Sequence, residues 1–274
     1  MSSIHALILG IVQGITEFLP VSSTAQIIIA GRLLGLGEEF RSAHGLSLEI
    51  FLHFPSVLAV MIYFYKDLIN VVKGFFYYVS KRTKEHRGDF YLGVYIIIAT
   101  LITSTIAFLV KDFVEDYMTT SAVMALTLTI TGVFLIIIER FKKYGVRDKE
   151  DMRYKDSVIV GLAQALAVIP GLSRSGTTLI AGLWSGLSRD MAVRYSFLMS
   201  IPVILGVSLV EMISIGDNML SDIGLSALIV GFISSFVFSI IGIVWLINFL
   251  KKGRLIYFSL YCFLMALLLI TVIR

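Results

Sequence analysis

The sequence predicts an all-α polytopic membrane protein made of two inverted-topology repeats, each with one re-entrant helical hairpin and three transmembrane helices. Three observations lead to this prediction: the composition is strongly apolar, six segments are long and apolar, and two further apolar segments are broken near their middles. Hydrophobic residues make up 57% of the 274 residues and charged residues only 15%, against about 25% charged in soluble domains. This composition excludes a soluble enzyme, and the single cysteine, Cys262, excludes an intrachain disulfide.

The six continuous apolar segments are long enough for helices that cross a membrane. About 20 residues of helix span a hydrocarbon core about 30 Å thick. We therefore predict transmembrane helices at 47–65, 91–110, 122–139, 191–213, 223–249 and 255–273. The segments between them are predicted as loops or turns, namely 66–89, 111–121, 140–156, 214–222 and 251–254.

Two more apolar segments, 4–36 and 157–188, have the length of a span but are interrupted. The first break reads LPVSST at 19–24, and the second reads IPGLSRSG at 169–176. Proline ends a helix, and a serine-rich stretch with unpaired backbone groups cannot face lipid. Each segment is therefore predicted to form a re-entrant helical hairpin whose tip is buried in protein.

The distribution of basic residues sets the predicted orientation. Sixteen of the 23 lysines and arginines lie in 66–89, 140–156 and 251–254, and loops rich in these residues stay on the cytoplasmic side. The loops at 111–121 and 214–222 are mostly acidic and belong outside. The first hairpin then enters from outside, the second from the cytoplasm, and both termini lie outside.

The two hairpins also begin an internal repeat, which divides a single membrane domain (1–274) into halves of about 1–145 and 155–274. The matched positions are Gln13 with Gln164, Pro20 with Pro170, and Pro55 with Pro202. Three spans per half is an odd number, so the second half must be inverted relative to the first. Many secondary transporters have this plan, and their site lies where the broken segments meet.

Residues 1–31 contain one formal charge, Glu17, and residues 157–188 contain one, Arg174; both are predicted to lie at membrane depth. An ionisable group there costs at least about 2.5–3.5 kcal/mol, so it is a functional candidate by default. The simplest alternative is a structural ion pair in which the two charges only neutralise each other. That alternative does not explain the hydroxyls near both charges. These are Ser22, Ser23 and Thr24 in the first tip, and Ser173, Ser175, Thr177 and Thr178 in the second.

The residues around Arg174 are of the types that bind phosphate. Gly171 and Gly176 let the backbone approach a ligand, and consecutive amides at a helix N-terminus bind anions. Arginine presents a planar fork that matches phosphate oxygens. A hydroxyl-lined cup with one arginine and one carboxylate predicts a site for phosphate or diphosphate, with a divalent cation bridged to the carboxylate.

Residues 13–24 (QGITEFLPVSST) and 170–178 (PGLSRSGTT) resemble the two signature motifs of the undecaprenyl-diphosphate phosphatase (bacitracin-resistance protein) family. The resemblance extends over nearly the whole chain. It implies a hydrolase of the cell membrane that removes the terminal phosphate of a polyprenyl diphosphate and leaves the monophosphate carrier for cell-envelope glycan synthesis. It further implies dependence on Mg²⁺ or Ca²⁺ and a pocket open to the extracytoplasmic side. The expected partners are the lipid substrate and membrane lipids, with a homodimer left open, and no nucleic acid.

The same motifs lead to a set of predicted roles. Arg174 holds the diphosphate, Glu17 accepts a proton or binds the cation with Gln13 as a neutral ligand, and Ser23 is the hydroxyl nucleophile. A water molecule activated by Glu17 is equally compatible with the sequence. The residues predicted to contact the diphosphate are Ser22, Thr24, Gly171, Ser173, Ser175, Gly176 and Thr178.

One position departs from the family pattern. Many members have a histidine three residues after the second serine of the first motif, where this chain has Gln26. An amide cannot take up or release a proton, so Gln26 cannot replace that histidine as an acid, base or nucleophile. Gln26, Glu49 and His53 are second-tier candidates for the site. A lone histidine in an apolar helix is more often a hydrogen-bonded core residue than a catalytic one. The departure also leaves open a second function, a transporter or flippase of the polyprenyl phosphate carrier.

Overall fold

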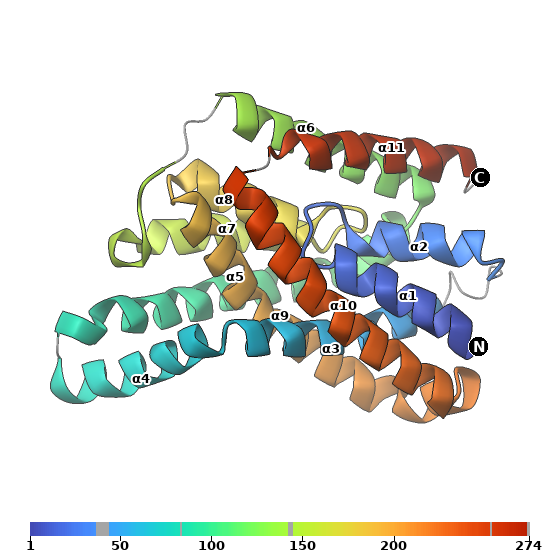
Figure 1. Ribbon diagram of the computed structural model, residues 1–274, viewed down its shortest axis with the longest axis horizontal. Helices are drawn as coiled ribbons and strands as arrows, with labels where there is room; N and C mark the ends of the chain where they lie inside the picture. Colours follow the sequence, from blue (N-terminus) through green and yellow to red (C-terminus); the bar gives the residue numbers. More distant parts are fainter. Residues whose placement is uncertain (37–43, 83, 142–144, 253, 273–274) are drawn as a thin grey trace.

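The computed structural model describes residues 1–36, 44–82, 84–141, 145–252 and 254–272, and across these residues the chain forms eleven α-helices (Figure 1). In chain order they are α1 (Ser3–Thr16), α2 (Ser23–Leu33), α3 (His44–Tyr63), α4 (Tyr65–Lys81), α5 (Arg87–Tyr117), α6 (Ser121–Phe141), α7 (Tyr154–Leu166), α8 (Arg174–Ser185), α9 (Arg189–Asp222), α10 (Leu225–Lys252) and α11 (Ile256–Val272). The prediction of an all-helical chain is confirmed for these residues.

Four helices have the length and hydropathy of a membrane span. They are Arg87–Val114 of α5, Ser121–Arg140 of α6, Arg189–Val210 of α9 and Leu225–Lys251 of α10. A fifth span results if α3 and α4 are taken together, although the two are bent by 74° at their junction. The segment predicted as the last span, 255–273, forms the shorter apolar helix α11. A multi-pass membrane protein is therefore the class that the fold indicates.

The prediction of a loop at 66–89 is wrong, because most of that segment forms α4 and the start of α5. Its lysines made the segment look like a connection between spans. They lie on an amphipathic helix, whose Gly74 packs closely against Asp89 of α5. The loop prediction at 214–222 is also wrong, because α9 continues to Asp222. The loop predicted at 111–121 was too long, because α5 continues to Tyr117.

Two pairs of short helices, α1 with α2 and α7 with α8, form the interrupted segments that the sequence predicted. Their lengths of 14, 11, 13 and 12 residues are below the about 20 residues needed to cross a hydrocarbon core. Figure 1 shows the two connecting loops near the centre of the molecule. They are in direct contact there, since Ser175 Oγ donates a hydrogen bond to the Leu19 carbonyl at 2.7 Å. In the same view α1 begins and α11 ends at one end of the molecule, and α4 ends and α5 begins at the other.

The helices of the two halves pack across each other in matching pairs. Helix α1 lies along α10 of the second half, while α7 lies along α5 of the first half, and α3 packs on α9 and α6 on α11. The loop prolines follow the same rule. The Pro170 carbonyl accepts a hydrogen bond from Thr127 of α6 at 2.8 Å, and the Pro20 carbonyl accepts one from Cys262 of α11 at 3.5 Å. Each tip is thus held by a helix from the other half.

Helices α1 and α10 approach so closely that their contact requires glycine. A Cβ atom on Gly14 would lie 2.5 Å from the Ser235 carbonyl oxygen and 2.8 Å from the Ser239 amide nitrogen. Gly10, one turn earlier, faces Gly231 and Ser234 in the same way. Small residues four apart let membrane helices meet backbone to backbone, so this seam fixes α1, which ends at the site.

We expect the substitution Gly14→Ala to destabilise the protein, because backbone atoms rather than movable side chains would meet the added methyl group. Overpacking of this kind lowers the free energy of unfolding by about 1–3 kcal/mol. Each kcal/mol lost lowers the thermal midpoint by about 2–4 °C in a protein of this size. The measurement is thermal unfolding in detergent. The matched control is Gly206→Ala on α9, whose Cβ would meet no atom within 4 Å. Equal midpoints for the two variants would contradict the prediction.

Candidate active site

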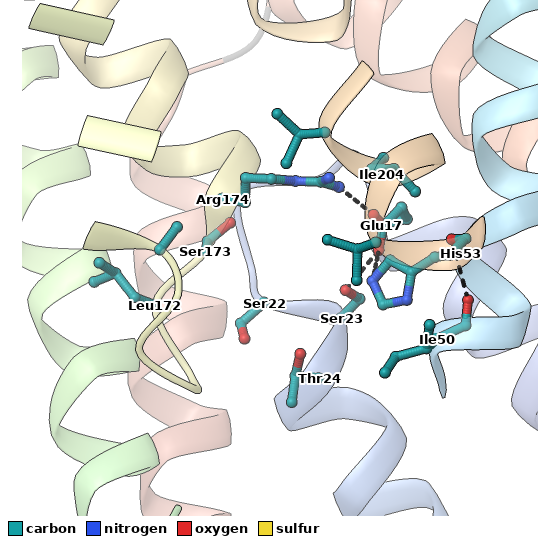
Figure 2. A pocket seen from close by; sticks show the side chains of 14 residues that line it. Glu17, Ser22, Ser23, Thr24, Ile50, His53, Leu172, Ser173, Arg174 and Ile204 are labelled. Atoms are coloured by element: carbon teal, nitrogen blue, oxygen red, sulfur yellow. Dashed lines mark hydrogen bonds and ion pairs between the residues drawn. The ribbon is translucent and has the colours of Figure 1, made fainter. Parts of the chain in front are cut away.

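A cavity of about 170 Å³ lies where the two hairpin tips meet α3 and α9 (Figure 2). The tips supply most of its polar lining, and α3 and α9 supply most of its apolar lining. The polar lining consists of Glu17, Ser22, Ser23, Thr24, His53, Ser173, Arg174 and Ser208, and the apolar lining of Ile50, Ala167, Leu172, Val203, Ile204 and Val207. The predicted catalytic residues Glu17, Ser23 and Arg174 are thus brought together in one cavity.

The carboxylate of Glu17 is the centre of the site and is only 3% exposed. Its Oε1 pairs with Arg174 Nη2, and its Oε2 accepts hydrogen bonds from Ser23 Oγ and Gln13 Nε2, each at 2.7 Å. His53 Nε2 lies 3.2 Å from the same oxygen. Figure 2 shows Arg174 reaching across the cavity to Glu17. The two opposite charges at membrane depth therefore form an ion pair, and a hydroxyl stands directly beside it.

The first tip presents the open N-terminus of α2 to the cavity. Ser22 occupies the N-cap position with φ +62°, and it makes no side-chain capping hydrogen bond. A non-glycine residue with positive φ is uncommon and is a form of strain found at functional sites. Ser22, Ser23 and Thr24 all line the cavity. The positive end of the α2 dipole therefore faces it, an arrangement that favours an anion.

The second tip is arranged around a capped helix. Ser173 is the N-cap of α8, and its Oγ accepts a hydrogen bond from the Gly176 amide at 3.1 Å. Arg174 is therefore the first residue of the helix. Gly171 has φ +85°, and a Cβ there would collide with Thr127 and Met124 of α6. This glycine allows the tip to pack against α6.

Several residues predicted to contact the diphosphate lie behind the cavity wall. Thr178 donates to the Arg174 carbonyl at 2.9 Å and is paired with Ser196 of α9. Ser175 donates to the Leu19 carbonyl, and the Gly176 amide donates to the capping hydroxyl of Ser173. Gly171, Ser175, Gly176 and Thr178 are not among the residues that line this cavity. Their contact with a diphosphate stays a prediction, while the structure places them where they shape α8 and hold Arg174.

Of the three second-tier candidates, only His53 lines the cavity. Gln26, at the position of the family histidine, points away from the cavity: its Oε1 accepts from Tyr261 of α11 at 2.7 Å, and its Nε2 donates to the Val21 carbonyl at 3.2 Å. Glu49 is buried and accepts a hydrogen bond from Thr24. His53 Nδ1 lies 2.7 Å from the Glu49 carbonyl. A carbonyl only accepts, so Nδ1 carries a hydrogen and Nε2 is turned to Glu17.

The apolar wall of the cavity was not predicted. Val203, Ile204 and Val207 belong to α9 and Ile50 to α3. An apolar residue on an apolar helix gives no sign of which neighbour it faces. The only available signal was the pairing of Pro55 with Pro202, which marks the same region of the two helices.

The residues around Glu17 are compatible with a divalent cation but do not form a complete cage. No group of three or more histidine, cysteine or acidic side chains with metal-binding geometry occurs among the residues described. The Oε1 atom of Gln13 is nevertheless buried and has no hydrogen-bond partner there, on the same side chain whose Nε2 contacts Glu17. One carboxylate with one neutral oxygen suits Mg²⁺, which takes its other ligands from water and substrate phosphates.

These features define a helical membrane protein with an ion-paired, hydroxyl-lined site between two hairpin tips. The chain belongs to the bacitracin resistance protein BacA family, whose model matches residues 6–268. It is similar to undecaprenyl-diphosphatase 2 of Halalkalibacterium halodurans, with 52% identity over 97% of this chain and 95% of the relative. Undecaprenyl-diphosphatase 1 of Shouchella clausii is 47% identical over 98% and 95%, and undecaprenyl-diphosphatase 3 of Bacillus anthracis is 38% identical over 96% and 94%.

Proposed function

We propose that this protein is an undecaprenyl-diphosphatase, a membrane hydrolase that removes the terminal phosphate of undecaprenyl diphosphate and leaves the monophosphate lipid carrier. The names and near full-length coverage of its relatives support this activity. One structural observation carries the proposal. The hydroxyl of Ser23 donates to Glu17 Oε2 at 2.7 Å while Arg174 contacts the other oxygen of the same carboxylate. The alternative of a transporter is not favoured, because these relatives are diphosphatases by name.

Glu17 and Ser23 have the arrangement of a base and a nucleophile. In the proposed reaction an oxygen attacks the terminal phosphorus, and the bond from that phosphorus to the bridging oxygen breaks. Glu17 takes the proton of the attacking group, and the lipid monophosphate leaves with the bridging oxygen. If Ser23 attacks, water then cleaves the phosphoserine and releases inorganic phosphate. If water attacks, phosphate is released in one step, and Ser23 orients Glu17.

Arg174 and the N-terminus of α2 bind the diphosphate in this proposal. The guanidinium lines the cavity together with Ser22, Ser173 and Thr24, so a diphosphate there would accept hydrogen bonds that now go to Glu17. Arginine and oriented amides stabilise the charge that spreads over the phosphoryl oxygens in the transition state. The ion pair would thus open when substrate binds, and the carboxylate would become free to act as a base.

A divalent cation, Mg²⁺ or Ca²⁺, is part of the proposal. One carboxylate oxygen of Glu17 and the Oε1 atom of Gln13 would hold it, with the other carboxylate oxygen left to take the proton. The cation would neutralise charge on the diphosphate oxygens. Removal of the cation with a chelator should then stop phosphate release without unfolding the protein.

We also propose that the chain consists of two inverted repeats, about 1–145 and 155–274, each with a re-entrant hairpin. The cross-packing of α1 on α10 and of α7 on α5 supports this architecture, as do the two tip prolines, each held by the opposite half. The concentration of basic residues in 66–89, 140–156 and 251–254 supports a cytoplasmic position for those segments. The site would then open to the outer face of the cell membrane.

The test of the function is direct. Purified protein in detergent is mixed with undecaprenyl diphosphate and Mg²⁺ or Ca²⁺, and released phosphate is measured over time. We expect phosphate and lipid monophosphate in equal amounts, and no release in the presence of excess chelator. Binding of the substrate without phosphate release under either cation would refute the hydrolase and leave a binding or transport function.

A further inference from the structure

A second, much smaller chamber lies beside Arg174, and Glu17 is not among its lining residues. Its volume is about 10 Å³, close to the volume that one water molecule requires. It is lined by two aromatic rings, one charged group and five polar groups, namely Phe18, Phe197, Arg174, Gln164, Ser175, Thr178, Ser196 and Ser200. Arg174 is the only residue that lines both this chamber and the large cavity. The chamber is therefore placed where it can act on the guanidinium.

One acceptor in the chamber wall has no partner. The Oε1 atom of Gln164 is buried and makes no hydrogen bond within the part of the chain that the structure describes, and the whole side chain is only 2% exposed. Burying an acceptor without a partner costs about 1–3 kcal/mol. A buried polar atom beside a chamber of this size indicates a ligand that donates a hydrogen bond.

The orientation of the Gln164 amide is set by the hydrogen bond of its nitrogen to Thr103. Gln164 Nε2 donates to Thr103 Oγ1 at 3.2 Å, and the hydroxyl hydrogen of Thr103 is used in a bond to the Gly161 carbonyl at 3.0 Å. Thr103 can therefore only accept from Gln164, so the nitrogen must face Thr103 and the oxygen must face away. The unpaired acceptor is thus a property of the network and does not depend on how the amide is assigned.

The charge and the size of the chamber select the ligand. A cation would be repelled by the guanidinium in the wall, and a phosphate group is too large for the space. A water molecule fits both neighbours, because it accepts from an N–H of Arg174 and donates to Gln164 Oε1. Arginine has five N–H donors, and the ion pair with Glu17 uses Nη2. We propose that the chamber holds one buried water molecule that links Gln164 to Arg174, and that Gln164 is a positioning residue for the diphosphate-binding guanidinium.

The internal repeat assigns a parallel task to the matched glutamine of the first half. Gln13 lies four residues before Glu17, and its Nε2 donates a hydrogen bond directly to the Glu17 carboxylate at 2.7 Å. Arg174 has only donors, so the amide nitrogen of a glutamine cannot bind it. The amide oxygen of Gln164 can bind Arg174 through a water molecule that lies between them. Each of the two tip charges is then steadied by a glutamine from the helix before its tip.

The experiment measures anion binding, so its outcome does not depend on turnover. This inference rests on the proposed function only in assigning the diphosphate to Arg174. Inorganic pyrophosphate is titrated into the purified full-length protein in detergent, for the wild type, Gln164→Leu, Gln164→Asn and Ser157→Ala. Leucine removes the acceptor, whereas asparagine keeps an amide oxygen that a second water molecule can reach. The matched control is Ser157→Ala on the same helix, which removes a buried hydrogen bond from Ser157 Oγ to the Tyr95 carbonyl and does not alter the residues that line the chamber.

We expect Gln164→Leu to weaken pyrophosphate binding by about tenfold, the effect of losing one hydrogen bond to a charged group. Gln164→Asn and Ser157→Ala should stay within about threefold of the wild type. In an Arg174→Lys background Gln164→Leu should weaken binding less than it does with Arg174 present, because the group that Gln164 positions is gone. If Gln164→Leu does not fold, Gln164→Met, which also lacks the amide oxygen, takes its place in both backgrounds.

Three results would overturn the inference: unchanged binding in Gln164→Leu, an equal loss in Ser157→Ala, or the same loss in both Arg174 backgrounds. A high-resolution experimental map without density in the chamber would do the same. If the wild type releases no phosphate from the lipid substrate but the variants bind pyrophosphate as expected, the proposed reaction is wrong and the role of Gln164 still holds.

Discussion

Arg174→Ala should lower phosphate release from undecaprenyl diphosphate by at least about 100-fold, since removing one preorganised donor to a developing charge costs about 10²–10³ in rate. The guanidinium is the only basic side chain besides His53 in the lining of the site cavity. Arg174→Lys should recover part of the activity, because it keeps the charge but loses the planar fork. Steady-state phosphate release, measured at saturating and at limiting substrate, checks both variants.

The control for Arg174→Ala is Arg194→Ala, which removes an arginine from an ion pair far from the site. Arg194 pairs with Asp67 at 2.7 Å at the start of α9, and its loss should change activity by less than about threefold. Because Arg174→Ala leaves Glu17 buried without its partner, part of its effect could come from unfolding. The double variant Arg174→Ala/Glu17→Gln removes both charges and should recover the thermal midpoint without recovering activity. Recovery of activity there would contradict the catalytic role.

Glu17→Gln should lower phosphate release by about 10²–10⁴-fold, the range for loss of a general base. Glutamine keeps the size of the side chain and can still accept from Ser23, but it cannot take a proton. The companion variant Ser23→Ala separates the two candidate nucleophiles. If Ser23 attacks, its loss should be as severe as that of Glu17. If water attacks, Ser23→Ala should retain clearly more activity than Glu17→Gln.

Acid quench during turnover, followed by mass spectrometry, gives an independent answer about the nucleophile. A phosphate on the peptide that contains Ser23 shows attack by the hydroxyl. Ser259→Ala is the matched control, because Ser259 is a buried serine that bonds to Gly132 between α11 and α6. Activity of Glu17→Gln within tenfold of the wild type would exclude Glu17 as the base.

The centre of the site could be predicted from the sequence because a charge at membrane depth must have a partner. Glu17 is the one formal charge in residues 1–31 and Arg174 the one in residues 157–188, so the cost of burying either alone predicted that they pair. Pro20 and Pro170 marked where the tips turn. Ser23 could be predicted because the motif places it at the start of a helix beside the turn.

Other features depend on contacts between distant segments and have no local signature. Gln26 bonds to Tyr261 across 235 positions of sequence, and nothing near Gln26 indicates that contact. The position of His53 beside Glu17 depends on how α3 crosses α1, so the sequence could only place it in a second tier. Helix α4 was taken for a loop because its three lysines were interpreted as the charges of a connection between spans. They lie instead on an amphipathic helix.

The ion pair between the hairpins has a consequence for how the molecule assembles. Glu17 is the one formal charge in residues 1–31, and Arg174 is the one in residues 157–188. If both tips lie within the membrane as proposed, either charge without the other would cost at least about 2.5–3.5 kcal/mol. Contact between the tips pairs the two charges and brings together the residues that line the cavity. Docking of the tips and formation of the site are therefore a single event in folding.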